Sequence, residues 1–189
     1  ETLRKTIIPT QLCQVKYNTS YASDFAVFEI GKVVNGYNEA GLCDEHKKLA
    51  ITLYSKTKDM EKLYFELRDV LAVMADDLKH LPLSFEKAEA THSYQHPKNL
   101  NNIYCAGKLL GEIGIVNATV SKNIDKKANI VYAEIDVEEF AKLKNASIKY
   151  EAPSKFPEIE IDLSFFSQTF APSPRPSRMQ TVLSLRRFP

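Results

Sequence analysis

DFAVFEIGKVVNGY, residues 24–37, is the part of the sequence from which the architecture follows. Residues 24–34 alternate in polarity and are rich in Phe, Val and Ile, a pattern typical of a β-strand. Asn35-Gly36 is a strong signal for a tight turn. Residues 48–54 alternate in the same way and predict a second strand. We therefore expect an antiparallel pair, with residues 37–46 as an exposed acidic loop between the strands.

The clearest helix is predicted on the C-terminal side of this pair, over residues 59–78. Asp59 is a suitable N-cap, and apolar residues follow at steps of three and four. On the N-terminal side, Pro9 is suited to the first turn of a helix that ends near Asn18. Leu81-Pro82 ends the long helix.

The rest of the chain alternates between short strands and short helices. Ala106-Gly107 predicts a hairpin turn, and Asn117 and Asp136 are suitable helix caps. Strands are expected at residues 83–90, 102–105, 109–116, 130–135 and 159–166, and helices at 117–124 and 137–143. Hairpin connections and few βαβ crossovers predict an α+β fold, with a mainly antiparallel β-sheet flanked by helices.

The charge is balanced overall but unevenly distributed. The 189 residues include 25 basic and 24 acidic side chains, which argues against non-specific nucleic-acid binding but leaves a local contact open. Residues 168–189 contain four arginines and no acid, so 21 basic and 24 acidic residues remain in the preceding body. Because this end also alternates Pro, Ser and Ala, we interpret residues 168–189 as a linker or an added tail. Residues 179–185 have room for one or two helical turns.

The cysteines and the lack of a long apolar run in the sequence predict the cellular compartment of the chain. Cys13, Cys43 and Cys105 are odd in number and far apart, as expected of free thiols in a reducing environment. No apolar run approaches the roughly 18–20 residues of a membrane span. The chain begins at Glu1 without Met, so we expect a cytoplasmic fragment with no membrane partner.

Five blocks of the chain resemble, in order, the β subunit of bacterial-type phenylalanyl-tRNA synthetases. Phe28 to Val33, FEIGKV, is similar to the strand of class II aminoacyl-tRNA synthetases called motif 2. The other blocks are LRKTIIP at residues 3–9; His96-Pro97 with Ile103-Tyr104, Gly107-Lys108, Gly111 and Ile113-Gly114; VYAEID at residues 131–136; and SKFP at residues 154–157 with Asp162-Leu163. The resemblance covers about residues 3–166.

This resemblance implies a class II aminoacyl-tRNA synthetase-like fold and a division of the chain. Residues 1–152 would be a catalytic-like but non-catalytic core module. Residues 153–167 would be the truncated start of a ferredoxin-like anticodon-binding domain. The implied partners are the α subunit of the synthetase and, through the holoenzyme, tRNA(Phe). ATP and Mg²⁺ are used by the holoenzyme, and we expect no cofactor in this fragment.

The sequence departs from an active synthetase where ATP would be held. In the family an arginine after motif 2 grips the α-phosphate, because its planar fork binds phosphate oxygens bidentately. Val34-Asn35-Gly36 stands there instead, and no glycine-rich motif 3 with its own arginine follows. We therefore expect no catalytic, cofactor-binding or metal-binding residue, and a structural role for the strand Phe28, Glu29, Ile30, Gly31, Lys32 and Val33. The domain is expected to be no enzyme by itself but part of an ATP-dependent ligase.

Two other functions stay open: a stand-alone synthetase-like domain that binds ATP or an amino acid, and a tRNA-binding module. Lys122, Lys126 and Lys127 are candidates for contacts with an RNA backbone, although a solvated loop is the simpler interpretation. His92 and His96 have the spacing of zinc ligands on a helix, but Pro97 argues for a loop. Cys43, near Asp44 and His46, is more simply a surface thiol than a nucleophile.

Overall fold

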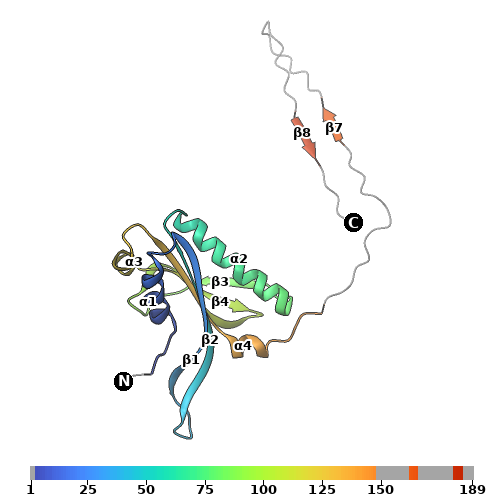
Figure 1. Ribbon diagram of the computed structural model, residues 1–189. Helices are drawn as coiled ribbons and strands as arrows, with labels where there is room; N and C mark the ends of the chain where they lie inside the picture. Colours follow the sequence, from blue (N-terminus) through green and yellow to red (C-terminus); the bar gives the residue numbers. More distant parts are fainter. Residues whose placement is uncertain (1–2, 148–161, 166–180, 185–189) are drawn as a thin grey trace. The chain divides into compact units, whose positions relative to one another are not determined.

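The computed structural model describes residues 3–147, 162–165 and 181–184, and it divides into two compact units, Glu1–Ile148 and Lys149–Pro189. The first unit carries the sheet and the helices (Figure 1). Its elements, in chain order, are α1 (Ile8–Asn18), β1 (Asp24–Tyr37), β2 (Cys43–Ser55), α2 (Met60–Lys79), β3 (Leu83–Lys87), β4 (Gln95–Cys105), β5 (Lys108–Val116), α3 (Ala118–Ile124), β6 (Asn129–Asp136) and α4 (Val137–Lys142).

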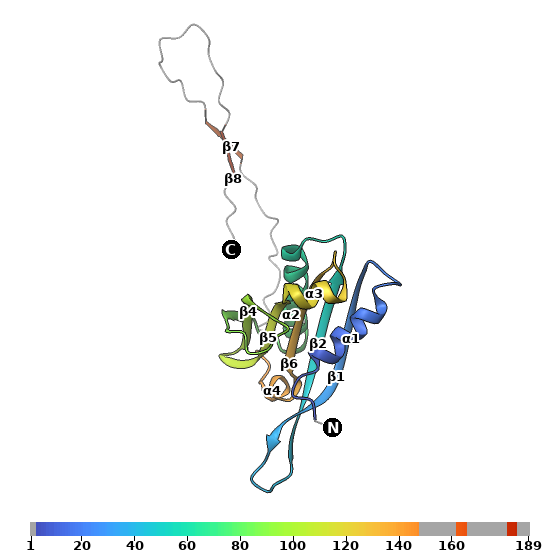
Figure 2. The same cartoon turned by 90° about the vertical axis from the view of Figure 1, so that its left-hand side faces the viewer.

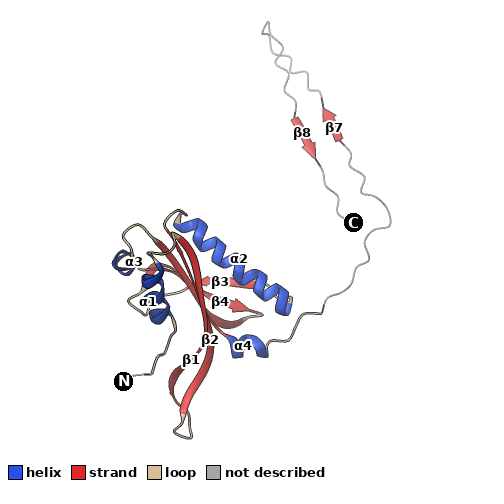
Figure 3. Ribbon diagram, viewed as in Figure 1, coloured by secondary structure: helices blue, strands red, loops and turns tan. Residues whose placement is uncertain are grey.

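The strands of this unit form one antiparallel sheet in the order β1-β2-β6-β5-β4-β3. Helices α1 and α3 pack on one face, and α2 and α4 pack on the other (Figure 3). We call these the α1 face and the α2 face. The predicted α+β fold with a mainly antiparallel, helix-flanked sheet is confirmed.

Strand β6 lies inside the sheet because its side chains are apolar in both directions. Val131, Ala133 and Ile135 join the core under α2, whereas Ile130 and Tyr132 join the core under α1. A strand covered on both faces loses the simple alternation of apolar and polar residues. On α2, the buried residues recur every fourth position, so one stripe of the helix faces the sheet. These are Leu63, Leu67, Leu71 and Ala75.

The first hairpin differs from its prediction. Asn35-Gly36 is not the turn, because β1 continues to Tyr37 and the register shifts between Val34 and Tyr37. Gly36 has a φ of +143° there, so the Asn-Gly pair is accommodated as an irregularity within the strand. The turn lies in residues 38–42, where the side chain of Asn38 accepts hydrogen bonds from two backbone N–H groups. Half of the predicted loop 37–46, Tyr37 and residues 43–46, is therefore strand.

The predicted turn at Ala106-Gly107 and two of the three predicted helix caps are confirmed. Ala106 and Gly107 have φ of +50° and +77° and join β4 to β5 in the predicted hairpin. The side chains of Asn117 and Asp136 cap α3 and α4, accepting from the N–H groups two and three residues on. Asp59 occupies the N-cap position of α2, but its side chain makes no capping hydrogen bond. Strand β4 begins seven residues earlier than predicted, and a register shift absorbs Pro97 within it.

In the second unit, β7 (Asp162–Phe165) pairs antiparallel with β8 (Thr181–Ser184). Strand β7 lies within the strand predicted at 159–166. The helical turns predicted at 179–185 are wrong, because β-branched Thr181 and Val182 belong to a paired strand. The prolines at 153 and 157 and most of the predicted tail lie outside the described residues. Among the described helices, none has the length and apolar character needed to cross a bilayer.

Candidate functional site

The strand that resembles motif 2 lies in the middle of β1, at one edge of the sheet. Its side chains alternate between the two faces. Val33 is buried in the core under α1, and Glu29 is on the same face. Phe28 and Ile30 point to the α2 face, where their side chains are 74% and 58% exposed. The strand therefore directs Glu29 and Val33 toward α1 and leaves Phe28 and Ile30 exposed on the other side.

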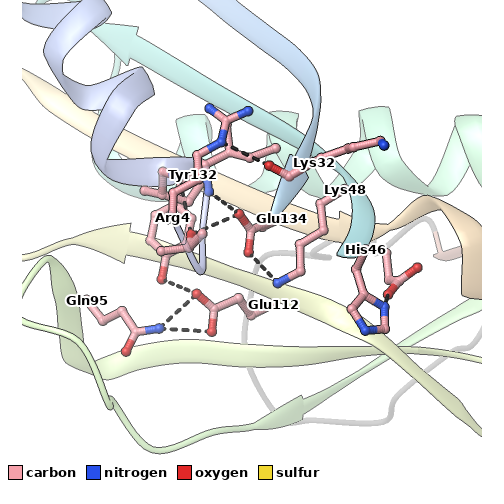
Figure 4. Close-up of polar contacts among 12 residues, drawn as sticks. Arg4, Lys32, His46, Lys48, Gln95, Glu112, Tyr132 and Glu134 are labelled. Atoms are coloured by element: carbon pink, nitrogen blue, oxygen red, sulfur yellow. Dashed lines mark hydrogen bonds and ion pairs between the residues drawn. The ribbon is translucent and has the colours of Figure 1, made fainter. Parts of the chain in front are cut away.

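Glu29 is bound by Arg4, a residue from the segment that precedes α1. The Arg4 guanidinium lies 2.7 Å from the Glu29 carboxylate and donates to the carbonyl of Lys32 at 3.1 Å (Figure 4). The Arg4 carbonyl accepts from the N–H of Val34. A Cβ at Gly31 would clash with the Arg4 guanidinium, so glycine leaves room for this crossing. Arg4 belongs to the block at residues 3–9, and Glu29 and Lys32 belong to the motif-2-like block. The contacts of Arg4 therefore join two of the blocks that carry the family resemblance.

Glu134 is the centre of a buried polar cluster on the α1 face. Its side chain lies on β6, is only 5% exposed and accepts hydrogen bonds from the Thr6 hydroxyl at 2.8 Å and the Ile7 N–H at 2.7 Å. Lys48, on β2, completes the set with an ion pair at 2.9 Å. Every oxygen of this carboxylate is engaged by the chain itself, which ties the N-terminal segment to the sheet.

A second carboxylate, Glu112, lies directly opposite Glu134 in the β5–β6 register. Like charges at such positions repel each other. Glu112 is bound by the buried amide of Gln95, at 2.8 and 2.9 Å, and by the Tyr132 hydroxyl at 3.0 Å. Burial raises the pKa of Tyr132 well above its ordinary value, so this hydroxyl stays protonated and can donate. Burial likewise raises the pKa of nearby Tyr94.

Beside this cluster is a polar cavity of about 210 Å³. Carboxylates outnumber lysines on its walls, which are formed by Lys5, Thr6, Lys48, His92, Tyr94, Asn102, Leu109, Leu110, Gly111, Glu112, Glu134 and Asp136. From the sequence, residues 130–135 are predicted as a strand and residues 131–136 carry part of the family resemblance, but a polar cluster around Glu134 is not predicted. A usable signal was present, since Glu134 is the one charged residue within the apolar run of β6.

The other candidates from the sequence lie apart from one another. The His92 ring stacks on Tyr94, whereas Nδ1 of His96 accepts from the N–H groups of Lys98 and Asn99. His46 faces Asp44 and Asp136, at 3.1 and 3.5 Å. Within residues 3–147 and the two short strands, no three His, Cys, Asp or Glu side chains are grouped as metal ligands would be. Cys13 and Cys43 are exposed thiols and Cys105 is a buried one.

A solved structure of similar fold is a pyrrolysyl-tRNA synthetase from Desulfitobacterium hafniense. It superimposes with a TM-score of 0.54 and 14% sequence identity, over 73% of this chain and 48% of the other. A likeness at this identity concerns the fold alone.

Sequence relatives give the family. Phenylalanine–tRNA ligase β subunits of Clostridium tetani and Bacillus licheniformis are 26% and 30% identical over 164 and 169 residues. Each match covers 86% of this chain, which spans about a fifth of the relatives' length. The model of the phenylalanyl-tRNA synthetase β chain CLM domain matches residues 1–137, which contain the motif-2-like strand, Arg4 and both clustered carboxylates. The chain therefore belongs to the family of phenylalanyl-tRNA synthetase β-chain CLM domains.

Proposed function

We propose that this domain is a non-catalytic structural module of a phenylalanine–tRNA ligase, that it packs against the catalytic α subunit, and that it thereby supports aminoacylation of tRNA(Phe). In this proposal the fold is that of a class II synthetase core, carried by residues 1–152. Residues 153–167 would begin an anticodon-binding domain, and ATP and Mg²⁺ would be used by the holoenzyme.

The uncovered part of the α2 face is the observation that carries the proposal. Helix α2 packs over β6, β5, β3 and part of β2, and it leaves Phe28 and Ile30 of the edge strand β1 exposed. Phe28 and Ile30 stand there beside their cross-strand partners Ile51 and Leu49, which are half-buried. We call these four residues the apolar strip. Contiguous exposed apolar side chains on a folded domain mark surfaces that another protein covers.

The α1 face supports the non-catalytic part of the proposal. Only Arg4 and Arg68 occur before residue 175. Arg4 is paired with Glu29. Arg68 is on α2, on the other face of the sheet, and its guanidinium lies 5.0 Å from the centre of the Phe85 ring on that same face. The cavity itself does not fit ATP, because Glu112, Glu134 and Asp136 face Lys5 and Lys48 and would repel a triphosphate. This observation also disfavours the stand-alone ATP-binding alternative.

The test is complex formation with the α subunit, followed by size-exclusion chromatography with light scattering. The unmodified chain is expected to form a stoichiometric complex. The double variant Phe28→Ser/Ile30→Ser should weaken the complex at least tenfold while its thermal melt stays near that of the parent. Leu109→Ser is the matched control, because Leu109 is 51% exposed on β5, away from the strip.

Two outcomes would count against the proposal. Equal complex formation by the double variant and the control would remove the apolar strip from the interface. No complex with the unmodified chain, together with calorimetric binding of ATP or phenylalanine to it, would favour the ligand-binding alternative.

A further inference from the structure

Five exposed lysines gather at one end of the first unit, and we call this surface the lysine end. Lys16 is in the last turn of α1 and Lys122 is in the last turn of α3. Lys126 and Lys127 follow α3, and Lys56 follows β2. All five are exposed. Lys122, Lys126 and Lys127 are close in sequence, but Lys16 and Lys56 are 66 or more residues away from them, and the fold brings the three segments together.

Polar contacts join the three segments that carry these lysines. The Lys56 ammonium donates to the carbonyl of Thr19, just beyond α1, at 3.2 Å. The same ammonium pairs with Asp125 at 3.0 Å, and Asp125 accepts from the N–H of Lys127 at 3.0 Å. Helices α1 and α3 lie beside each other on this face of the sheet (Figure 2). The lysine end is therefore one continuous surface.

Most of this positive charge is not neutralised. Asp125 is the carboxylate paired within the surface, and it is matched by Lys56. Among the residues that the structure describes, no carboxylate lies within 4.0 Å of the ammonium groups of Lys16, Lys122, Lys126 or Lys127.

Two exposed aromatic rings accompany the lysines. The side chains of Tyr17, in the last turn of α1, and Tyr21, in the loop that follows it, are 79% and 85% exposed. Exposed aromatic rings among cations are the combination that nucleic-acid surfaces use: lysines neutralise phosphates, and rings stack on accessible bases or sugars. An acidic polypeptide would use the lysines but would gain little from the tyrosines.

We propose that the lysine end binds the phosphate backbone of RNA, with Tyr17 and Tyr21 as adjacent stacking surfaces. The contact is independent of base sequence, because lysine ammonium groups read charge rather than base edges. An RNA partner is consistent with the tRNA ligase family of the chain. The inference goes beyond subunit packing, and it uses none of the residues of the apolar strip.

The test measures fluorescence anisotropy of a labelled tRNA(Phe) transcript with the 189-residue chain over a series of salt concentrations. The variant Lys16→Gln/Lys122→Gln/Lys126→Gln/Lys127→Gln should bind at least tenfold more weakly. The slope of the logarithm of the association constant against the logarithm of the salt concentration should become shallower by about 3. Each lost phosphate contact reduces the magnitude of this slope by roughly 0.7–0.9, and four lysines are replaced. Tyr17→Ala/Tyr21→Ala should weaken binding about threefold to tenfold with the slope unchanged.

The matched control is Lys47→Gln/Lys62→Gln/Lys87→Gln/Lys98→Gln, which removes the same charge from exposed lysines elsewhere. Its affinity should fall less than threefold. Equal losses in the two quadruple variants would show a general charge effect and overturn the proposal, as would unchanged binding by the lysine-end variant. If polyglutamate binds as tightly as the transcript and loses the same affinity in that variant, the partner is an acidic polypeptide and RNA is wrong. The apolar-strip variant should bind the transcript normally, so failure here is separable from failure of subunit packing.

Discussion

On the α1 face the carboxylates next to the sheet are paired within the chain, whereas on the α2 face the apolar side chains are only partly covered. Glu134, Glu112 and Glu29 each have partners from this chain, and those partners fix the N-terminal segment against the sheet. Under α2 the core is apolar, but it ends before β1, where Phe28 and Ile30 are exposed. The difference indicates that the buried carboxylates of the α1 face need no outside partner, whereas the exposed apolar strip of the α2 face calls for one.

The contrast within the α2 face can be tested by truncating one side chain at a time. Leu67→Ala should lower the free energy of unfolding by about 3 to 4 kcal/mol, because Leu67 is fully buried and its removal leaves a cavity. Phe28→Ala should cost less than about 1 kcal/mol, since its ring is mostly exposed. Urea unfolding of both variants measures the difference. Similar losses would mean that Phe28 is packed within the isolated domain, contrary to the apolar-strip assignment.

The attachment of the N-terminal segment to the α1 face depends on Glu134. Glu134→Ala should destabilise the domain by about 2 to 3 kcal/mol, because the Ile7 N–H and the Lys48 ammonium lose their partner in a buried setting. Glu45→Ala is the control, since it breaks an exposed pair with Lys32 that water and salt screen, and it should change the stability far less. The measurement is again urea unfolding. Equal effects would show that the buried cluster adds no stability.

A smaller effect on the same face is expected to depend on pH. The Lys127 N–H, the Lys56 ammonium and the Tyr54 hydroxyl lower the pKa of Asp125 to about 2. A carboxyl whose pKa is lower in the folded than in the unfolded chain stabilises the fold above the unfolded value, and this contribution is lost as the pH falls from about 4 to 2. After allowance for solvent screening, Asp125→Asn should cost about 1 kcal/mol at pH 7.

Thermal melts of Asp125→Asn and the parent over pH 2–7 would check this expectation. The gap in Tm should be constant above pH 5 and should close toward pH 2. A gap that persists at pH 2 would mean that the hydrogen-bond geometry, and not the charge, is what Asp125 contributes.

The sequence by itself determined most of the local structure. The apolar stripe of α2, the caps Asn117 and Asp136, and the turn at Ala106-Gly107 each act through neighbours a few residues away, so their patterns are visible in the chain. The order of five short blocks likewise indicated the family, which the family model over residues 1–137 confirmed. Where a local signal failed, as at Asn35-Gly36, the pairing of β1 with β2 overrode it.

Only the tertiary structure decided which distant groups meet. Thr6, Lys48 and Glu134 converge because β2 and β6 are neighbours in the sheet and the N-terminal segment crosses them. The exposure of Phe28 likewise could not be predicted from the sequence. The alternation of residues in β1 predicts that the strand has two faces, but it does not predict which of them a helix covers. Burial and electrostatic neutralisation depend on all the groups around a side chain, and these come from segments far apart in sequence.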